Sequence, residues 1–228
     1  MLAVFKKEFK SYFLSPVGYV VIGIFLLVFS LFFYLTAIPS SGTIDLGSLY
    51  FYAALYGLII VAPILTMRMF AEERKSGTEQ LIMTSPVSMF GVVMGKFLAA
   101  MSVVAITLVI SLMYFAIVSF FGAPNIKVTL VAMLGFILIS AAAISIGMFA
   151  SSITENQIIA GILTIAFLII SLFIEQLSSV FSNIAIINFY QKFPSGVISL
   201  TEVVGLISFT LMFIEFTIMV MQRRKLVK

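Results

Sequence analysis

Long apolar segments alternate with short polar ones along the whole chain. Six segments are nearly free of charge, and each is close to the roughly 20 residues that an α-helix needs to cross the hydrocarbon core of a bilayer. The predicted spans are residues 17–37, 49–67, 97–121, 128–151, 158–173 and 200–221. The apolar runs are unbroken rather than alternating, which excludes a transmembrane β-barrel. The sequence therefore predicts an all-α polytopic membrane protein, a single transmembrane domain over residues 1–228.

The first fifteen residues follow a different pattern, with apolar and polar side chains on opposite sides of a helix. The apolar side holds Leu2, Phe5, Phe9, Tyr12 and Phe13, and the polar side holds Lys6, Lys7, Glu8, Lys10 and Ser11. We expect residues 1–15 to form an amphipathic helix on the membrane surface. A plain basic flank to the first span is the alternative, and it accounts for the lysines but not for the aromatic spacing.

Local signals add detail to the remaining segments. The sequence Ser15–Pro16 is typical of a helix N-cap, and Thr154–Gln157 is typical of a capping box. Residues 174–196 are less hydrophobic, and we expect short re-entrant helices there, on the extracellular side before the sixth span. Small side chains line one face of the fourth span and favour close helix packing. They are Ser140, Ala143, Gly147 and Ser151.

Composition and charge narrow the class of protein. Hydrophobic residues make up 62% of the chain and charged residues 10%, with a mean hydropathy of +1.25, as in an integral membrane protein. The absence of Cys and His removes disulfides, thiol nucleophiles and the commonest zinc ligands, so no metal site is expected. The net charge of +4 comes from basic residues beside the apolar runs, which favours a role in membrane topology and argues against nucleic acid as a partner.

Basic residues also predict the orientation. With both termini in the cytoplasm, eleven of them lie on the inside and only Lys127 and Lys192 lie outside. The longest polar stretch, residues 69–96, then forms a cytoplasmic loop between spans two and three. Gly77 favours a chain reversal, and Thr78 and Glu79 favour a new helix over Glu79–Thr84 that exposes Leu81. Physical reasoning alone leaves two interpretations of this helix, a lever for a cytoplasmic partner or an ordinary surface loop.

The run EERKSGTEQLIMTSPVS at 72–88, followed by Gly95-Lys96-Phe97, resembles the signature of permease subunits of ABC transporters of the ABC-2 type. The stretches SSITENQIIAGIL at 151–163 and FPSGVISLTEVV at 193–204 most resemble the gliding-motility-associated permease subfamily. This resemblance implies that residues 69–96 carry the coupling helix that docks into the ATPase. The matching coupling residues are Glu73, Arg74, Gly77, Thr78, Glu79, Leu81, Pro86 and Lys96. Glu73 and Arg74 pair either with the partner or with each other and lipid headgroups.

The chain itself shows no ATPase motif. The nearest candidate, residues 91–97, has the wrong glycine spacing and places Phe97 where a phosphate loop needs Ser or Thr. The resemblance therefore implies no cofactor on this chain, and ATP and magnesium on two copies of a cytoplasmic ABC ATPase. It also implies a second permease chain, identical or homologous, and export across a prokaryotic plasma membrane. The alternative function is an ATPase-linked membrane anchor or mechanical transducer that acts on an accessory membrane or extracytoplasmic protein.

Glu215 is the weak candidate for a substrate pathway. It lies about seven residues from the inner end of the sixth span, roughly 10 Å deep at helical rise. An acid at that depth is costly unless it is paired, protonated or faces a polar cavity. The alternative is that Glu215 snorkels or packs in neutral form against Thr217 or Ser208.

Overall fold

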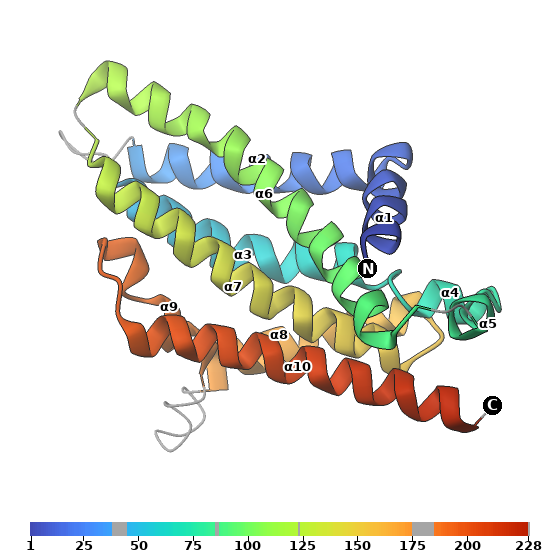
Figure 1. Ribbon diagram of the computed structural model, residues 1–228. Coiled ribbons are helices and arrows are strands. Elements are labelled where there is room, and N and C mark those ends of the chain that lie inside the picture. The colour runs from blue at the N-terminus through green and yellow to red at the C-terminus, as the bar shows by residue number, and fades with distance from the viewer. Residues whose placement is uncertain (38–44, 85–86, 123, 175–184, 228) are drawn as a thin grey trace.

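The structure is a computed structural model that describes residues 1–37, 45–84, 87–122, 124–174 and 185–227, and these residues form a helical bundle (Figure 1). The long helices are α2 (Val17–Ala37), α3 (Leu46–Thr66), α6 (Met89–Phe121), α7 (Ile126–Ile153), α8 (Gln157–Phe173) and α10 (Leu200–Val227). The other elements are α1 (Leu2–Leu14), α4 (Ala71–Lys75), α5 (Glu79–Thr84), α9 (Ile186–Tyr190) and the 3-10 turn η3 (Phe193–Ser195). Helices α1, α4 and α5 lie at one end of the bundle, with the last turns of α10, and we call this the charged end.

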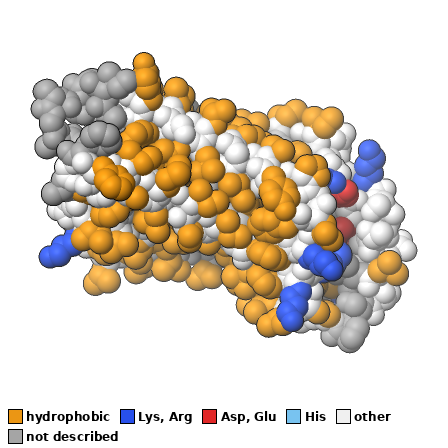
Figure 2. Space-filling model, turned by 90° about the horizontal axis from the view of Figure 1, so that it is seen from above, with side chains coloured by type: hydrophobic (Ala, Val, Ile, Leu, Met, Phe, Trp, Pro, Cys, Tyr) orange, Lys and Arg blue, Asp and Glu red, His pale blue; other side chains and the backbone are white. Residues whose placement is uncertain are grey.

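Within the described residues, five helices are long and apolar enough to cross a membrane, namely α2, α3, α6, α7 and α10. The protein is therefore a multi-pass membrane protein. The predicted span 158–173 corresponds to α8, which has 17 residues and is shorter than these five. Figure 2 shows hydrophobic side chains over most of one face, with several Lys and Arg side chains at one end.

Side-chain caps explain why three helices begin before their apolar runs. Asp45 accepts a hydrogen bond from the backbone N–H of Gly47, so α3 begins at Leu46 rather than at residue 49. Ser88 and Asn125 cap α6 and α7 in the same way. As a result α6 begins eight residues before the predicted span 97–121. The apolar pattern marks the part of a helix inside lipid, whereas the cap marks where the helix starts.

Two expectations about helix ends are wrong. Asn156, not Thr154, is the N-cap of α8, and its side chain accepts from Ile158 N–H at 2.9 Å. Ser15 closes α1 instead of opening α2, since its N–H donates to the Ser11 carbonyl. Helix α10 extends past the predicted span 200–221, through the basic residues to Val227. Cations are favourable in the last turn of a helix because they oppose its dipole.

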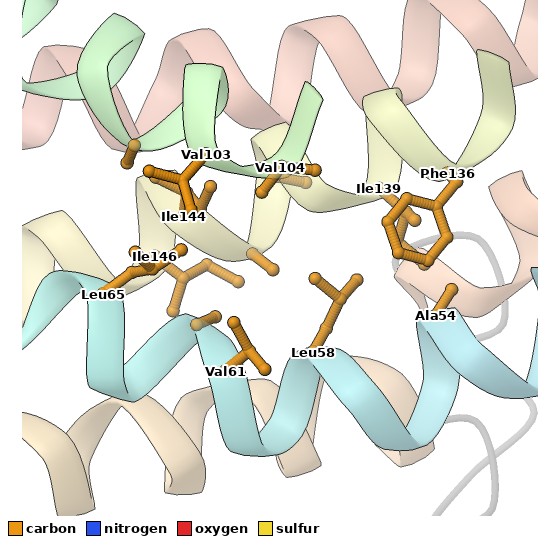
Figure 3. Close-up of a cluster of buried hydrophobic side chains, with 14 of the residues drawn as sticks. Ala54, Leu58, Val61, Leu65, Val103, Val104, Phe136, Ile139, Ile144 and Ile146 are labelled. Atoms are coloured by element: carbon orange, nitrogen blue, oxygen red, sulfur yellow. The ribbon is translucent and has the colours of Figure 1, made fainter. Parts of the chain in front are cut away.

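The core is centred on α3 and α7, which approach each other closely. The small side chains of α7 predicted to allow this approach are all buried. At Gly147 a Cβ atom would collide with the side chain of Thr66, so the contact requires glycine. Apolar side chains of α3, such as Leu58 and Val61, point toward Val103 and Val104 of α6 and toward α7 (Figure 3).

The opposite end of the bundle is closed by α9 and η3, which lie within the segment predicted to form short helices; residues 175–184 of that segment are outside the described residues. The Tyr190 hydroxyl is buried and donates to the Tyr50 carbonyl at 3.0 Å. Phe193 packs on Gly135, where a Cβ would clash with its ring. Lys192 and Glu202 form an ion pair at 2.6 Å. These contacts attach the short segments to α3, α7 and α10.

Candidate functional site

The polar stretch 69–96 folds as two short helices followed by the first turns of α6. Between α4 and α5 the chain reverses at Gly77, whose φ of +74° lies in the left-handed region that glycine adopts without strain. The hydroxyl of Thr78 donates to the Glu73 carbonyl at 3.3 Å and bonds Ser76 Oγ at 2.9 Å. Thr78 therefore holds the turn against α4, while Glu79 lies in the first turn of α5.

Lys96, two turns into α6, is buried with a 2% exposed side chain. Its ammonium lies 2.8 Å from Glu73 Oε1 of α4 and 3.1 Å from Glu8 Oε1 of α1. Lys7 lies 3.5 Å from the same oxygen of Glu73, and the Phe70 ring lies 5.3 Å from Lys96 Nζ. A buried ammonium requires such compensation, because its desolvation is costly. This Lys96 cluster, made of Lys7, Glu8, Glu73 and Lys96, joins α1, α4 and α6.

A second set of ion pairs involves Arg74 of α4 and Glu79 of α5. Arg74 pairs with Glu155 at 2.6 Å, and Arg224 pairs with the buried Glu79 at 3.4 Å. Both guanidinium groups also donate to the carbonyl of Ile153, at 3.3 and 3.4 Å. This arginine cluster, made of Arg74, Glu79, Glu155 and Arg224, joins α4 and α5 to the α7–α8 turn and to α10.

Ser151 supplies a third link, between the end of α7 and the start of α4. Its hydroxyl oxygen accepts from the backbone N–H groups of Phe70 and Ala71 at 3.1 and 3.2 Å, and its proton is donated to the Met67 carbonyl at 3.2 Å. The first N–H groups of a helix have no partner inside that helix. A side chain from a different helix therefore satisfies the start of α4.

A cavity of about 300 Å³ lies between α1, the end of α3 and the turn at Gly77. Its walls carry three cations and three acids, so their formal charges cancel. These residues are Lys7, Arg68, Lys96, Glu8, Glu72 and Glu73. Tyr12 also lines the cavity, and its hydroxyl donates to the Leu65 carbonyl at 3.0 Å. Burial raises the pKa of this hydroxyl. The hydrogen bond from Arg68 lowers the pKa of Glu72. In the described ranges no three acidic side chains are grouped so as to hold a metal ion.

The structure thus distributes the predicted coupling residues over two clusters. Glu73 and Lys96 meet in the Lys96 cluster, and Arg74 and Glu79 lie in the arginine cluster. Leu81 is 72% exposed on α5. Pro86 lies outside the described residues.

The hypothesis that Glu73 and Arg74 pair with each other is wrong. Consecutive helical residues point about 100° apart, so the two side chains reach different helices. Three partners in the two clusters were not identified as site residues, because each is far away in the sequence from the residue it binds. They are Glu8, which pairs with Lys96, Glu155, which pairs with Arg74, and Arg224, which pairs with Glu79. Ser151 was noted only as a small residue for packing.

Glu215 is exposed on α10 rather than packed against a neighbour. Thr217, one of its two expected partners, is buried on the other side of the helix and donates to the Phe213 carbonyl at 2.8 Å. Ser208 lies two turns away on the same exposed side.

The bundle of long apolar helices agrees with the family comparison. The model of the ABC-2 family transporter protein matches residues 38–225. The chain belongs to the ABC-2 transporter family. It is the permease component of an ABC-2 transporter, and its family implies association with an ABC ATPase. Comparison with curated protein sequences finds no match.

In this ABC-2 permease the matched region begins directly after α2, so α1 and α2 precede it. Residues 91–97, the stretch nearest to a phosphate loop, lie inside the continuous helix α6. A phosphate loop needs backbone N–H groups free to face the phosphates, and here they belong to a helix. These residues therefore lack the geometry of a phosphate loop, and as part of α6 they place Lys96 against Glu73.

Proposed function

We propose that the chain is the permease of an ABC exporter in which α5 is the coupling helix for a cytoplasmic ABC ATPase. The observation that supports this most is the two-sided character of α5. Leu81 is 72% exposed, whereas Glu79 on the same helix is 5% exposed and bound to Arg224. An exposed apolar side chain on an anchored helix is suited to docking on a partner.

The ion pairs support a mechanical role for the coupling segment. ATP-driven closure of two ATPase subunits would displace α5 and α4 together, since Thr78 and Gly77 hold the turn between them closed. The Lys96 cluster would carry that displacement to α1 and α6. The arginine cluster would carry it to α7, α8 and α10. Packed helices respond to such a displacement by moving as units, which is the basis of alternating access.

The proposed assembly has two permease chains, identical or homologous, and two ATPases that bind ATP and magnesium. Helix α8, about 26 Å long at 1.5 Å per residue, is proposed as the sixth span. The proposed orientation has six spans with the basic charged end inside, and it puts both termini in the cytoplasm of a prokaryotic cell. The proposed direction is export, or extraction from the membrane toward the outside, and the resemblance to gliding-motility-associated permeases supports a place in that subfamily.

Co-purification of an ATPase tests this function. The tagged protein is extracted gently from native membranes with and without nucleotide, and ATP hydrolysis is measured in the eluate. We expect hydrolysis with the wild type and its loss with Leu81→Asp, while thermal unfolding of the permease stays the same. Absence of an ATPase from the wild-type eluate would remove the basis for the proposal.

Gly77 provides a second variant with a matched control. Gly77→Ala and Gly122→Ala each add a Cβ that meets no atom within 4 Å, but only Gly77 has a positive φ. A non-glycine residue in that conformation costs roughly 1–2 kcal/mol. We expect Gly77→Ala to reduce ATPase retention and Gly122→Ala to leave it unchanged. Equal behaviour of the two variants would show that the turn geometry does not matter for docking.

A further inference from the structure

Helix α10 carries a polar residue at every seventh position on its exposed side. These residues are Thr201, Ser208, Glu215 and Gln222, and all four are exposed. We call them the α10 seam. The apolar side chains exposed beside the seam are Val204, Ile207, Leu211, Met212, Phe216 and Met219. The buried Thr210 and Thr217 lie on the other side of α10, and their hydroxyls donate to carbonyls one turn back at 2.8 Å.

The exposed side of α8 is different and provides an internal comparison. Its exposed large side chains are Ile158, Ile159, Ile162, Ile165, Ile169 and Ile170. A surface of this kind suits lipid chains, which offer no hydrogen bonds. At Ser208 and Glu215, which lie well inside the predicted span 200–221, the α10 seam instead exposes polar groups that lipid chains cannot pair.

Glu215 is the residue of the seam that would be most costly to expose to lipid, because it is an acid. It lies 13 residues after Glu202 and eight before Arg223, or about 20 Å and 12 Å along the helix. Within the described ranges its carboxylate makes no hydrogen bond or ion pair. An acid at such a depth needs a partner or a proton.

The spacing of the seam indicates the shape of that partner. A seven-residue repeat keeps one stripe of side chains against a neighbouring helix that crosses at a shallow angle. A binding site for a small solute needs polar groups at only one depth of the membrane. The seam instead extends over 22 residues, roughly 30 Å. We propose that the α10 seam docks a transmembrane helix of a different membrane protein, which carries a basic residue at the depth of Glu215.

Charge argues against a second copy of this chain at the seam. Two α10 helices related by a two-fold axis would bring their Glu215 carboxylates together. In the part of the chain that the structure describes, the spans expose no Lys or Arg at that depth that a second copy could offer. A basic residue from another protein satisfies the carboxylate directly.

The inner end of the same helix is attached to the coupling helix through the Glu79–Arg224 pair. A helix bound at the seam is therefore attached to a part of the permease that the ATPase would move. This consequence rests on the proposed function, whereas docking at the seam does not. A helix of an accessory membrane protein bound there would receive part of the motion of the exporter.

The test uses synthetic Leu/Ala transmembrane helices of about 20 residues. One peptide carries Arg at the depth of Glu215 and the other carries Leu there. The permease is reconstituted in phosphatidylcholine vesicles, and peptide binding is measured by energy transfer to a dye on Val197→Cys, the only thiol in an otherwise cysteine-free chain. We expect the Arg peptide to bind roughly tenfold more tightly than the Leu peptide. Glu215→Leu should remove the difference, and Ile165→Leu on α8 should preserve it.

Three results would overturn the proposal. The first is equal affinity for the two peptides, or an Arg preference that survives Glu215→Leu. The second is disulfide formation between two copies of Ser208→Cys in native membranes, which would assign the seam to a second permease. The third is binding of tetraphenylphosphonium as tight as that of the Arg peptide, which would indicate a site for small lipophilic cations. ATPase co-purification is measured separately, so loss of ATPase docking with peptide binding intact would count against the proposed function alone.

Discussion

Lys96 and Glu73 form a buried ion pair, with 2.8 Å between Nζ and Oε1. Lys96 belongs to α6, which crosses the bundle, and Glu73 belongs to α4, the short helix that precedes α5. The pair therefore joins α4 directly to the helical bundle of the permease. Glu8 Oε1 of α1 lies 3.1 Å from the same Lys96 Nζ, so α1 is joined to α6 as well.

Replacing Lys96 should be strongly destabilising. Lys96→Met leaves Glu8 and Glu73 near each other with no buried cation, and breaking a buried pair from one side costs about 3–5 kcal/mol. We expect a large drop in the thermal unfolding temperature of the detergent-purified protein. Lys75→Met, at an exposed lysine of α4, is the matched control and should change it little. The triple variant Lys96→Met, Glu8→Gln and Glu73→Gln should recover most of the stability. A small effect of Lys96→Met alone would contradict burial of the charge.

Arg224 and Arg223 are adjacent but have different surroundings. Arg224 bonds Glu79 and the Ile153 carbonyl, whereas Arg223 is exposed. Arg224→Gln should cost about 1.5–3 kcal/mol in the free energy of unfolding, because it leaves the buried Glu79 without its cation. Arg223→Gln should stay within about 0.5 kcal/mol of the wild type. Chemical denaturation in mixed micelles measures both, and equal losses would argue against the Glu79–Arg224 pair.

Ser151 and Ser152 offer a similar comparison at the end of α7. Both are fully buried, but the Ser152 hydroxyl donates only to the Phe149 carbonyl in its own helix. The Ser151 hydroxyl accepts from two backbone N–H groups and donates to a carbonyl near α4. Ser151→Ala should cost about 1–3 kcal/mol because it leaves buried backbone groups unpaired. Ser152→Ala should cost much less. Hydrogen exchange at the Phe70 and Ala71 amides should rise only in Ser151→Ala, and protection that survives the change would refute the link.

The contact between α3 and α7 depends on Gly147. Gly147→Ala places a methyl group against Thr66, and the resulting overpacking should cost about 1–3 kcal/mol. Gly161→Ala on α8 meets only Met67 at an ordinary 3.8 Å and should be tolerated. Thermal unfolding of the two variants is the measurement. Similar unfolding temperatures would mean that α3 and α7 can separate at little cost.

Acid should lower the free energy of unfolding slightly, because Glu72 becomes protonated and loses its pairing with Arg68. The hydrogen bond from Arg68 lowers the pKa of Glu72 below its ordinary 4.5, so this pair stabilises the fold above that value and the contribution is lost as the pH falls through the lowered pKa. Both side chains are more than two-fifths exposed, so the effect should be at most about 1 kcal/mol. When the free energy of unfolding is measured from roughly pH 6 to pH 3, it should fall less steeply in Glu72→Gln than in the wild type. Identical slopes would show that other carboxylates account for the acid sensitivity.

Local sequence was enough to locate the long helices and the turn at Gly77. Glycine at position 77 and an acid at position 79 are local signals, and α5 covers the residues expected from them. Local sequence could not predict which charged side chains are buried or which of them pair with each other. Glu8 was assigned to the solvent side of α1, because a periodic pattern shows which face is polar but not that a buried lysine of α6 lies opposite it. Arg224 was interpreted only as part of a basic flank, and its partner is 145 residues away.

These long separations set an order for the assembly of the permease. Glu8 is synthesised 88 residues before Lys96, and Glu79 is synthesised 145 residues before Arg224. At ribosomal rates of about 5–20 residues per second, the first acid waits roughly 4–18 s for its lysine and the second roughly 7–29 s for its arginine. Helix α5 therefore gains its ion pair to α10 only after α10 has been made. Until then the buried carboxylate of Glu79 has no cation beside it, so this contact at the charged end is among the last of the fold to form.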